Sequence, residues 1–455
     1  MPSLNSIMSI ALSGLQSSQG ALDVTSNNIA NSSTTGYTRE VVNLSESGPV
    51  TQNGVSYGTG VTLNGYTSVR DEVLQLQIYR QQSQTSYSEA QANALEQAQA
   101  PFADTTNNIS TNITSFFNDL SAMSTDPSNS ALRQTVLSDA QNIANSFHST
   151  ASSLSSLSSS LDQTVAPTVS QINQLTSQIA NLNAQIQSAG ANGQNTSTLE
   201  DSRTQLVSQL SQLTNVQTTQ TGQGLTITTG NGTPLVAGSN AYTLTTAAGS
   251  NGMTDVMANG QDITASINGG SLGGTLQVRD TALTGLTSQL DTLASQFASA
   301  VNTANAAGYD LTGASGSAIF SSSNGGSITA ANIQVAITSR SQIAASSDGT
   351  TGSAGNLSTL LAVKSTALPS GLTPTDAYAQ IVSNVGQQAS QATTNNTAAN
   401  TVLTQLQTQL ASVSGVSLDE ETANMIRYQM AYQAAAKVIS TVDTLANTLI
   451  GITTT

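Results

Sequence analysis

The two ends of this chain carry matching heptad patterns, which constrain its fold more than any other feature. Residues that alternate at intervals of three and four lie along one narrow face of a helix, and a partner must cover that face. The N-terminal pattern comprises Leu4, Met8, Ala11, Leu15, Ser18, Leu22, Thr25 and Ile29. The C-terminal pattern comprises Met425, Tyr428, Tyr432, Ala435, Ile439, Val442, Ala446 and Leu449. The sequence therefore predicts a helix at each end and the pairing of the two helices.

Such pairing can occur within one subunit or between subunits. An ordinary intrachain helix pair is the simpler arrangement. The two patterns, however, lie at the extreme ends of the chain, where a single subunit has least surface to bury them against. This location favours packing between subunits. Ser18 and Thr25, the polar members of the N-terminal pattern, either set the register or are merely tolerated.

The C-terminal helix has clear start and stop signals. Ser417 and Glu420 have the spacing of a capping box, in which each side chain binds a free backbone N–H of the first turn. Glu421 adds negative charge near the positive end of the helix dipole. Gly415 and Gly451 mark the two ends. We therefore predict a discrete helix between them.

The composition excludes several classes of function. Charged residues make up only 8% of the 455 residues, and the net charge is −15. This balance argues against nucleic-acid binding, which needs clustered Arg and Lys. The absence of cysteine excludes disulfides, thiolate metal sites and a thiol nucleophile. Sparse charge suits dense self-assembly, although it is equally compatible with an acidic or saline habitat.

We also expect no catalytic, cofactor or metal site. The single histidine, His148, follows Phe147 on a predicted helix and has no identifiable catalytic partner. Capping and dipole compensation account for the acidic run 419–421. No apolar run approaches the roughly 20 residues of a membrane span, so membrane insertion is not expected. The interleaved Ser, Asn and Gln of the N-terminal stretch indicate that no signal peptide is cleaved.

The predicted fold class is mainly α with β inserts (α+β), with long terminal and central helices in coiled-coil-like bundles. We divide the chain at changes in periodicity and at glycine or proline turn signals. The segments are a terminal helix plus extended hairpin (1–66), a first helical part (67–215), a small outward β insert domain (216–276), a second helical part (277–412) and the C-terminal helix (413–455). The second helical part includes a Gly/Ser-rich, β-like segment, 308–355.

Two terminal sequences resemble a known family. The run ALDVTSNNIAN at residues 21–31, followed by Gly36 and Tyr37, resembles the N-terminal signature of bacterial flagellar axial proteins. The matching positions are Asn27, Asn28, Ala30, Asn31, Gly36 and Tyr37. The runs SGVSLDEE at 414–421 and YQMAYQAAAKVI at 428–439 resemble the C-terminal end of its hook-associated members. The internal runs STDP at 124–127 and GGTLQVRD at 273–280 favour the members that join hook to filament.

The resemblance implies a structural protein of the hook–filament junction that is not an enzyme. The terminal helices would line an export channel, the central helices would form a shell around them, and the β insert would face outward. The implied partners are further copies of the chain, the hook protein, the second junction protein and an export chaperone on the C-terminal region. The implied location is the extracellular flagellum, reached through the flagellar type III export apparatus.

The signature turn also has a physical explanation. We expect Gly36 to adopt a positive φ after the first helix, and Tyr37 to anchor the turn by packing. Thr35 occupies the position where the family usually has proline. The chain also passes quickly from Phe320 to Ile333, so the outer β domain that many relatives insert there is expected to be absent.

Two alternatives remain open. One is another axial protein, either a flagellin or the second junction protein, against which the internal runs argue. The other is a secreted adhesin or hydrolase with flagellar-type ends. Segment 216–276, where a catalytic pair would be sought, contains few ionisable residues.

Overall fold

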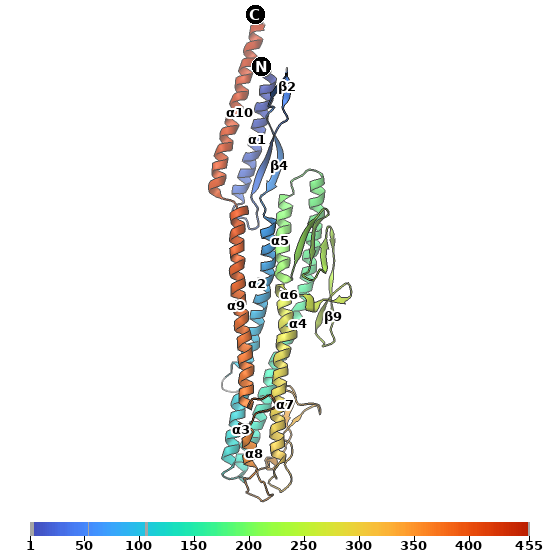
Figure 1. Cartoon of the computed structure of the whole chain (residues 1–455), viewed down its shortest axis with the longest axis vertical. Coiled ribbons are helices and arrows are strands. Elements are labelled where there is room, and N and C mark those ends of the chain that lie inside the picture. The colour runs from blue at the N-terminus through green and yellow to red at the C-terminus, as the bar shows by residue number, and fades with distance from the viewer. Residues whose placement is uncertain (1–3, 53, 105–107, 454–455) are drawn as a thin grey trace. The chain divides into compact units, whose positions relative to one another are not determined.

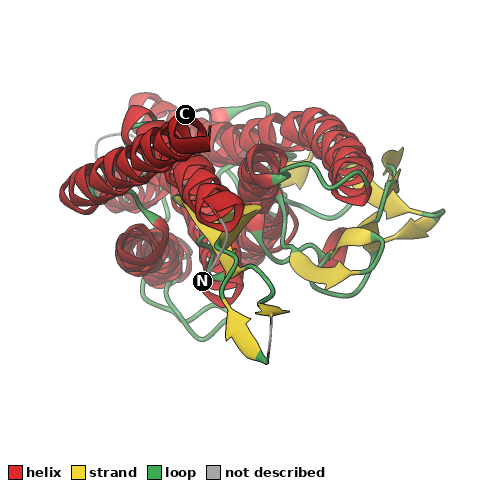
Figure 2. Cartoon of the chain, turned by 90° about the horizontal axis from the view of Figure 1, so that it is seen from above, coloured by secondary structure: helices red, strands yellow, loops and turns green. Residues whose placement is uncertain are grey.

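The computed structural model describes residues 4–52, 54–104 and 108–453. Long helices dominate it, and the strands form small antiparallel sheets (Figures 1 and 2). The α-helices are α1 (Leu4–Ala30), α2 (Glu72–Gln99), α3 (Ile109–Met123), α4 (Ser130–Ala191), α5 (Ser197–Leu213), α6 (Gly270–Gln277), α7 (Thr284–Ala306), α8 (Leu357–Ala362), α9 (Pro374–Ser414) and α10 (Leu418–Thr453). The predicted fold class, mainly α with β inserts, is confirmed.

The strands pair mostly with neighbours in the sequence. They are β1 (Glu40–Glu46), β2 (Val50–Gln52), β3 (Val55–Tyr57), β4 (Val61–Ser68), β5 (Gln217–Thr221), β6 (Gly224–Thr228), β7 (Pro234–Ala237), β8 (Asn240–Ala241), β9 (Leu244–Ala248), β10 (Thr254–Ala258), β11 (Gln261–Asp262), β12 (Phe320–Ser322) and β13 (Ile333–Val335). The sheets have the orders β1-β4, β2-β3, β5-β6-β7-β8, β11-β10-β9 and β12-β13. Each is therefore a local hairpin or meander.

The chain forms two compact units. The first takes its described residues from 1–83, 171–244 and 400–455, and the second from 84–170 and 245–399. Because each unit draws on segments far apart in the sequence, neither can form until distant parts of the chain have met. Helices α2, α4 and α9 contribute residues to both units.

The first unit contains both chain ends. Helices α1 and α10 pack along each other, and the β1–β4 ribbon packs against α1 (Figure 1). A small apolar cluster of Leu74, Ile78 and Leu403 joins its portions of α2 and α9. The β5–β8 sheet is fastened to α4 by Asn183, whose Nδ2 donates to the carbonyl oxygens of Leu225 and Gly238, at 2.8 Å each.

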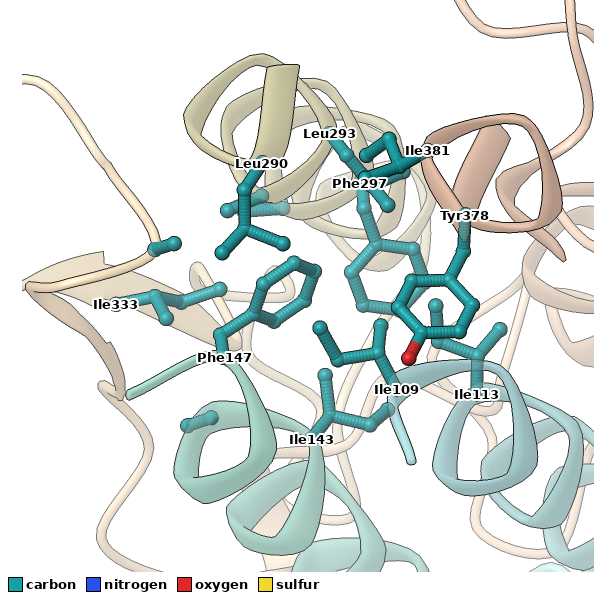
Figure 3. Packing of buried hydrophobic residues seen from close by; sticks show 14 of the residues in the cluster. Ile109, Ile113, Ile143, Phe147, Leu290, Leu293, Phe297, Ile333, Tyr378 and Ile381 are labelled. Carbon is teal, nitrogen blue, oxygen red and sulfur yellow. The ribbon is translucent and has the colours of Figure 1, made fainter. Parts of the chain in front are cut away.

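The second unit holds the largest apolar core. Helices α3, α4, α7 and α9 direct apolar side chains toward a common centre, where Phe147, Leu290 and Phe297 meet (Figure 3). The α7 residues recur at helical spacing, with Leu286, Leu290 and Phe297 fully buried. That spacing explains why this segment is a helix and which face it buries.

Segment 216–276, predicted as one β insert domain, contains two separate sheets followed by helix. Its last strand ends at Asp262, and the glycine-rich run that follows belongs to α6. The glycines serve close packing: a Cβ added to Gly274 would lie 2.4 Å from the backbone oxygen of Tyr87. Helix α6 therefore approaches α2 more closely than any residue with a Cβ would allow.

Strands β12 and β13 form one hairpin, with Phe320 opposite Val335 and Ser322 opposite Ile333. The connection consists of residues 323–332. This chain accordingly has only a short loop at the position where an outer β domain is expected in relatives.

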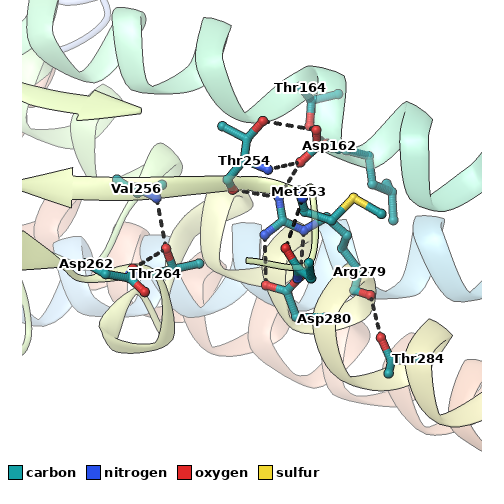
Figure 4. A network of polar contacts seen from close by, with 12 residues as sticks. Asp162, Thr164, Met253, Thr254, Val256, Asp262, Thr264, Arg279, Asp280 and Thr284 are labelled. Atoms are coloured by element: carbon teal, nitrogen blue, oxygen red, sulfur yellow. Dashed lines mark hydrogen bonds and ion pairs between the residues drawn. The ribbon is translucent and has the colours of Figure 1, made fainter. Parts of the chain in front are cut away.

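A buried arginine, Arg279, connects the β11-β10-β9 sheet to helices of the second unit (Figure 4). The Arg279 side chain is 1% exposed, and its Nη1 donates to Asp162 Oδ1 at 2.6 Å and to the Thr254 oxygen at 2.9 Å. Its Nε and Nη2 donate to the two carboxylate oxygens of Asp280, at 2.7 and 2.9 Å. Desolvation disfavours the cation, but the two carboxylates outweigh it and raise the pKa of Arg279. Three elements, α4, β10 and the helical turn after α6, thus share one charge network.

The second unit should become less stable as the pH rises toward neutrality. Burial, followed by the hydrogen bond and the charge of Asp119, raises the pKa of Asp139 from 3.8 to about 7. Because the folded state holds this proton more tightly than the unfolded state, the stabilisation is complete below about pH 4 and is lost as the pH rises through 7. Asp139→Asn should therefore raise the free energy of unfolding at pH 8 by about 1 kcal/mol, a value discounted for solvent screening.

Urea denaturation of the full chain at pH 5 and pH 8 measures this effect. Glu89→Gln, which neutralises an exposed carboxylate on α2, is the matched control. An equal gain for both variants, or the same gain at both pH values, would contradict the assignment to the Asp119–Asp139 pair.

Candidate assembly surface

Helices α1 and α10 run antiparallel and share one register. A Cβ on Gly14 would lie 4.0 Å from the Cβ of Ala435, and Asn28 Nδ2 donates to Glu421 Oε2 at 3.2 Å. In both pairs the residue numbers add up to 449. Residue n of α1 therefore lies level with residue 449 − n of α10.

The residues of the two heptad patterns lie on the mutually covered faces of this pair. Ala11, Thr25 and Val442 are buried, and most of the others are half-buried. Leu449 is the exception, with 52% of its surface exposed, since its level on α10 is beyond the first described residue of α1. Polar Ser18 fits because its Oγ donates to the Gly14 oxygen at 2.8 Å. The predicted pairing of the two ends thus occurs within the chain, and packing between subunits remains a prediction for these residues.

A second set of apolar residues on α10 lies outside the face that α1 covers. We call it the outer stripe; it consists of Ile426, Met430, Ala434, Val438 and Leu445, all exposed. With 3.6 residues per turn, Ile426 and Met430 fall on the side of α10 opposite the heptad residues, whereas Val438 and Leu445 fall beside the heptad face. Met430, in its middle, is 63% exposed. Helix α10 is therefore apolar on two faces, and α1 covers only one of them.

Asn28, a signature residue, is the centre of a buried hydrogen-bond cluster and is 1% exposed. Its Nδ2 donates to the Glu40 oxygen at 2.9 Å as well as to Glu421. Its Oδ1 accepts from Tyr37 Oη at 2.8 Å and from the Glu40 N–H at 3.0 Å. One side chain thus joins α1, the turn after it, β1 and the first turn of α10.

The turn that carries Tyr37 has the predicted geometry. Gly36 has φ +82°, which confirms the expected positive φ. Burial, followed by the negative charge of Glu40, raises the pKa of Tyr37 to about 12, so the phenol stays protonated and donates to Asn28. Gln205 of α5 donates from Nε2 to the Thr35 oxygen at 2.7 Å. The other signature side chains are peripheral: Asn31 bonds Asn27 at 2.8 Å, and Ala30 is exposed.

Charged side chains extend the cluster to α5. Asp201 accepts from Thr38 Oγ1 at 2.7 Å and from Arg70 Nη2 at 2.8 Å. Arg70 also pairs with Glu200 at 3.1 Å. Sequence reasoning missed Asp201 and Arg70, and it gave Glu421 a role at the helix dipole without predicting its burial or its hydrogen bond to Asn28.

The start of α10 differs from the predicted capping box. The Glu420 N–H lies 3.5 Å from Ser417 Oγ, at the limit of a hydrogen bond. The Glu420 carboxylate accepts from Arg39 Nη1 at 2.7 Å instead of turning back to the backbone. The Arg39 N–H also donates to the Ser414 oxygen at 3.0 Å. The contact that the Glu420 carboxylate would make with the backbone in a capping box is therefore replaced by a long-range ion pair with Arg39.

Neither a metal site nor a membrane span is found among the described residues. Among them, no three His, Asp or Glu side chains converge in a way that would hold a metal ion. None of their helices is long and apolar enough to span a membrane.

Comparison with known proteins gives matches along the whole chain. Residues 95–320 match the family described as flagellar hook-associated protein FlgK helical domain. Residues 407–452 match the C-terminal region of flagellar basal body rod FlgEFG proteins, and residues 8–38 match flagella basal body rod proteins.

Individual relatives agree with these families. Flagellar hook-associated protein 1 of Salmonella typhimurium is 29% identical, and that of Escherichia coli K12 is 27% identical, each over 99% of this chain and 100% of the relative. The Bacillus subtilis protein of the same name is 27% identical over 96% of both chains. The Escherichia coli alignment extends over 546 positions, so part of that relative has no counterpart among these 455 residues.

The fold agrees as well. The hook junction protein FlgK of Burkholderia pseudomallei superposes with a TM-score of 0.67 at 21% identity, over 74% of this chain and all of that structure. The terminal signatures, the helical domain and the full-length relatives lead to one conclusion: this chain belongs to the flagellar hook-associated protein 1 family.

Proposed function

We propose that this protein is a structural, non-enzymatic component of the bacterial flagellum that joins the hook to the filament. The observation that supports this most directly is the outer stripe, an apolar face on a helix whose other face α1 already covers. A row of exposed Ile, Met, Val and Leu side chains is unusual on a monomer and is typical of a surface that another protein covers.

Further copies of the chain are the proposed main partners. Burying one such side chain contributes about 1.5–3 kcal/mol. Several of them, repeated at each contact around a ring, would compensate for the loss of translational freedom on assembly. The heptad residues that pair α1 with α10 would hold the stripe in place, and the Asn28 cluster would hold the helix pair against α5.

The remaining partners are proposed from the resemblance to hook-associated flagellar proteins. The hook protein and the second junction protein would contact the assembled zone from either end. A chaperone would cover the C-terminal region before export through the flagellar type III apparatus, and the protein would act outside the cell.

A strain that lacks this protein tests the proposal. Electron microscopy should show bare hooks, and flagellin should be shed into the medium. Intact filaments on the mutant would overturn the assignment, and loss of the hooks as well would move the protein inward to hook or rod.

Met430→Glu should abolish the junction without unfolding the subunit. Its side chain contributes to the stripe but is 63% exposed, so a carboxylate there remains hydrated in the monomer and would be desolvated in the assembly. Swimming should be lost and shed flagellin should approach the level of the deletion strain. Gln429→Glu, an exposed neighbour off the stripe, is the matched control and should swim normally. Equal behaviour of the two variants would exclude the stripe as a contact surface.

A further inference from the structure

We infer that the helical segment between α6 and α7 contains one inserted residue, and that this insertion aims Arg279 at the β11-β10-β9 sheet. The segment, Val278–Leu283, has π-helical geometry and joins α6 directly to α7. The run GGTLQVRD at 273–280 ends within it. This run would therefore contain the device that anchors the sheet, and Asp280 would be a residue that positions Arg279.

The backbone spacing of the segment indicates the inserted residue. Each N–H of an α-helix bonds the carbonyl four residues earlier, whereas in a π-helix it bonds the carbonyl five residues earlier. A single π-turn therefore holds one residue more than an α-turn. Thr284 has the same spacing, since its Oγ1 donates to the Arg279 oxygen five residues earlier, at 3.5 Å, the limit of a hydrogen bond (Figure 4).

The wider turn keeps the flanking helices in phase with their own contacts. A Cβ added to Gly274 of α6 would lie 2.4 Å from the backbone oxygen of Tyr87. Helix α7 buries Leu286, Leu290 and Phe297 completely. An additional residue in a regular α-helix would rotate everything after it by about 100°. Because the π-turn accommodates that residue locally, both contact faces keep their directions.

The wider turn also accounts for a contact between adjacent residues. Neighbours in an α-helix do not face each other, yet Arg279 donates from Nε and Nη2 to the two carboxylate oxygens of Asp280. More residues per turn mean less rotation from one residue to the next, which brings these two side chains toward one side. Asp280 thereby fixes the guanidinium, whose Nη1 donates to Asp162 and to the Thr254 oxygen.

Thr254 is the residue through which this network holds the sheet. Its N–H and its Oγ1 donate to the two carboxylate oxygens of Asp162, at 2.8 and 3.0 Å, and its carbonyl oxygen accepts from Arg279 at 2.9 Å. All three polar groups of the first residue of β10 are thus engaged. Because the Arg279 side chain is only 1% exposed, water does not readily replace a lost partner. A misdirected guanidinium would therefore release the sheet and leave the apolar core in place.

Single-residue deletions in the full-length Arg279→Met chain test whether the segment contains an insertion, because this background removes the buried charge. Thr281 is exposed in the π-helical segment, and Ser288 is exposed on α7. Deletion of Thr281 should convert the π-turn into an α-turn and change the urea midpoint little. Deletion of Ser288 should rotate the rest of α7 by about 100° and abolish the cooperative unfolding of the second unit.

Hydrogen exchange in the chain that retains Arg279 tests the role of the insertion. Deletion of Thr281 should make the amides of residues 254–258 exchange about tenfold faster or more, as expected for the loss of a charged hydrogen bond. The amides of α7 should keep their protection. In the Arg279→Met chain the same deletion should add nothing, because the device acts through Arg279.

Three results would overturn the inference. Equal loss of structure after the two deletions in the Arg279→Met chain would mean that the segment holds no inserted residue. Unchanged exchange of β10 after deletion of Thr281 would mean that the insertion does not aim Arg279. Faster exchange of β10 on deleting Thr281 in the Arg279→Met chain would assign the effect to other contacts.

Discussion

Arg279→Met is expected to lower the free energy of unfolding of the second unit by about 3 kcal/mol. Methionine fills a similar volume but makes none of the guanidinium contacts. Asp162 would lose its charged partner while only 20% exposed, and the Thr254 oxygen would lose its donor. Asp280 is less constrained and regains water more readily. Most of the loss in unfolding free energy therefore arises at the contact between β10 and α4.

Urea denaturation followed by circular dichroism measures this change as a lower midpoint. Limited proteolysis should show earlier cleavage within 244–262, the sheet that Arg279 holds. Arg279→Lys should be intermediate, because an ammonium keeps the charge but cannot form the two-pronged contact with Asp280. Arg340→Met removes an exposed arginine in the same unit and should change stability little. If both methionine variants behaved alike, the network would contribute nothing beyond surface charge.

Asn28→Ala is expected to detach the terminal helix pair from its support. The substitution removes four hydrogen bonds and leaves the buried Glu421 carboxylate without its amide donor. Each unsatisfied buried group costs about 1–3 kcal/mol, so we expect a local loss of about 3 kcal/mol or more. The change should appear as faster hydrogen exchange at the start of α10 and in β1, with the second unit unaffected.

Asn27→Ala is a close control for this prediction. Asn27 is exposed, and its side chain bonds only Asn31 one turn away among the contacts described. Swimming should be impaired in the Asn28 variant and retained in the Asn27 variant. Comparable exchange rates in the two variants would show that the buried cluster does not hold the helices in place.

Local patterns allowed much of this fold to be predicted. Heptad spacing predicted both terminal helices and the faces they bury, because an α-helix repeats every 3.6 residues wherever it occurs. Gly36 was predictable for the same reason, since a positive φ is a property of a single residue. The run at 268–274 was harder, because glycine serves both loops and close helix packing, and only the nearness of Tyr87 distinguishes the two uses.

The partners of the charged side chains could not be read from the sequence. Glu420 has the spacing of a cap but binds Arg39, 381 positions away. Arg279 and Asp162 are separated by 117 positions. No local periodicity specifies such pairs, because they depend on how distant helices meet.

The sequence by itself determined the helical class, the two terminal helices, the apolar face of each and the family signature, since all of these depend on spacing over a few turns. The tertiary structure decided the antiparallel register of α1 and α10, the burial of Asn28 and Glu421, and the exposure of the outer stripe. The physical reason is that a side chain is buried only when a second surface covers it, and the sequence of one helix does not specify that surface. Ile426, Met430 and Leu445 are apolar residues that the structure leaves exposed, because α1 covers a different side of the helix.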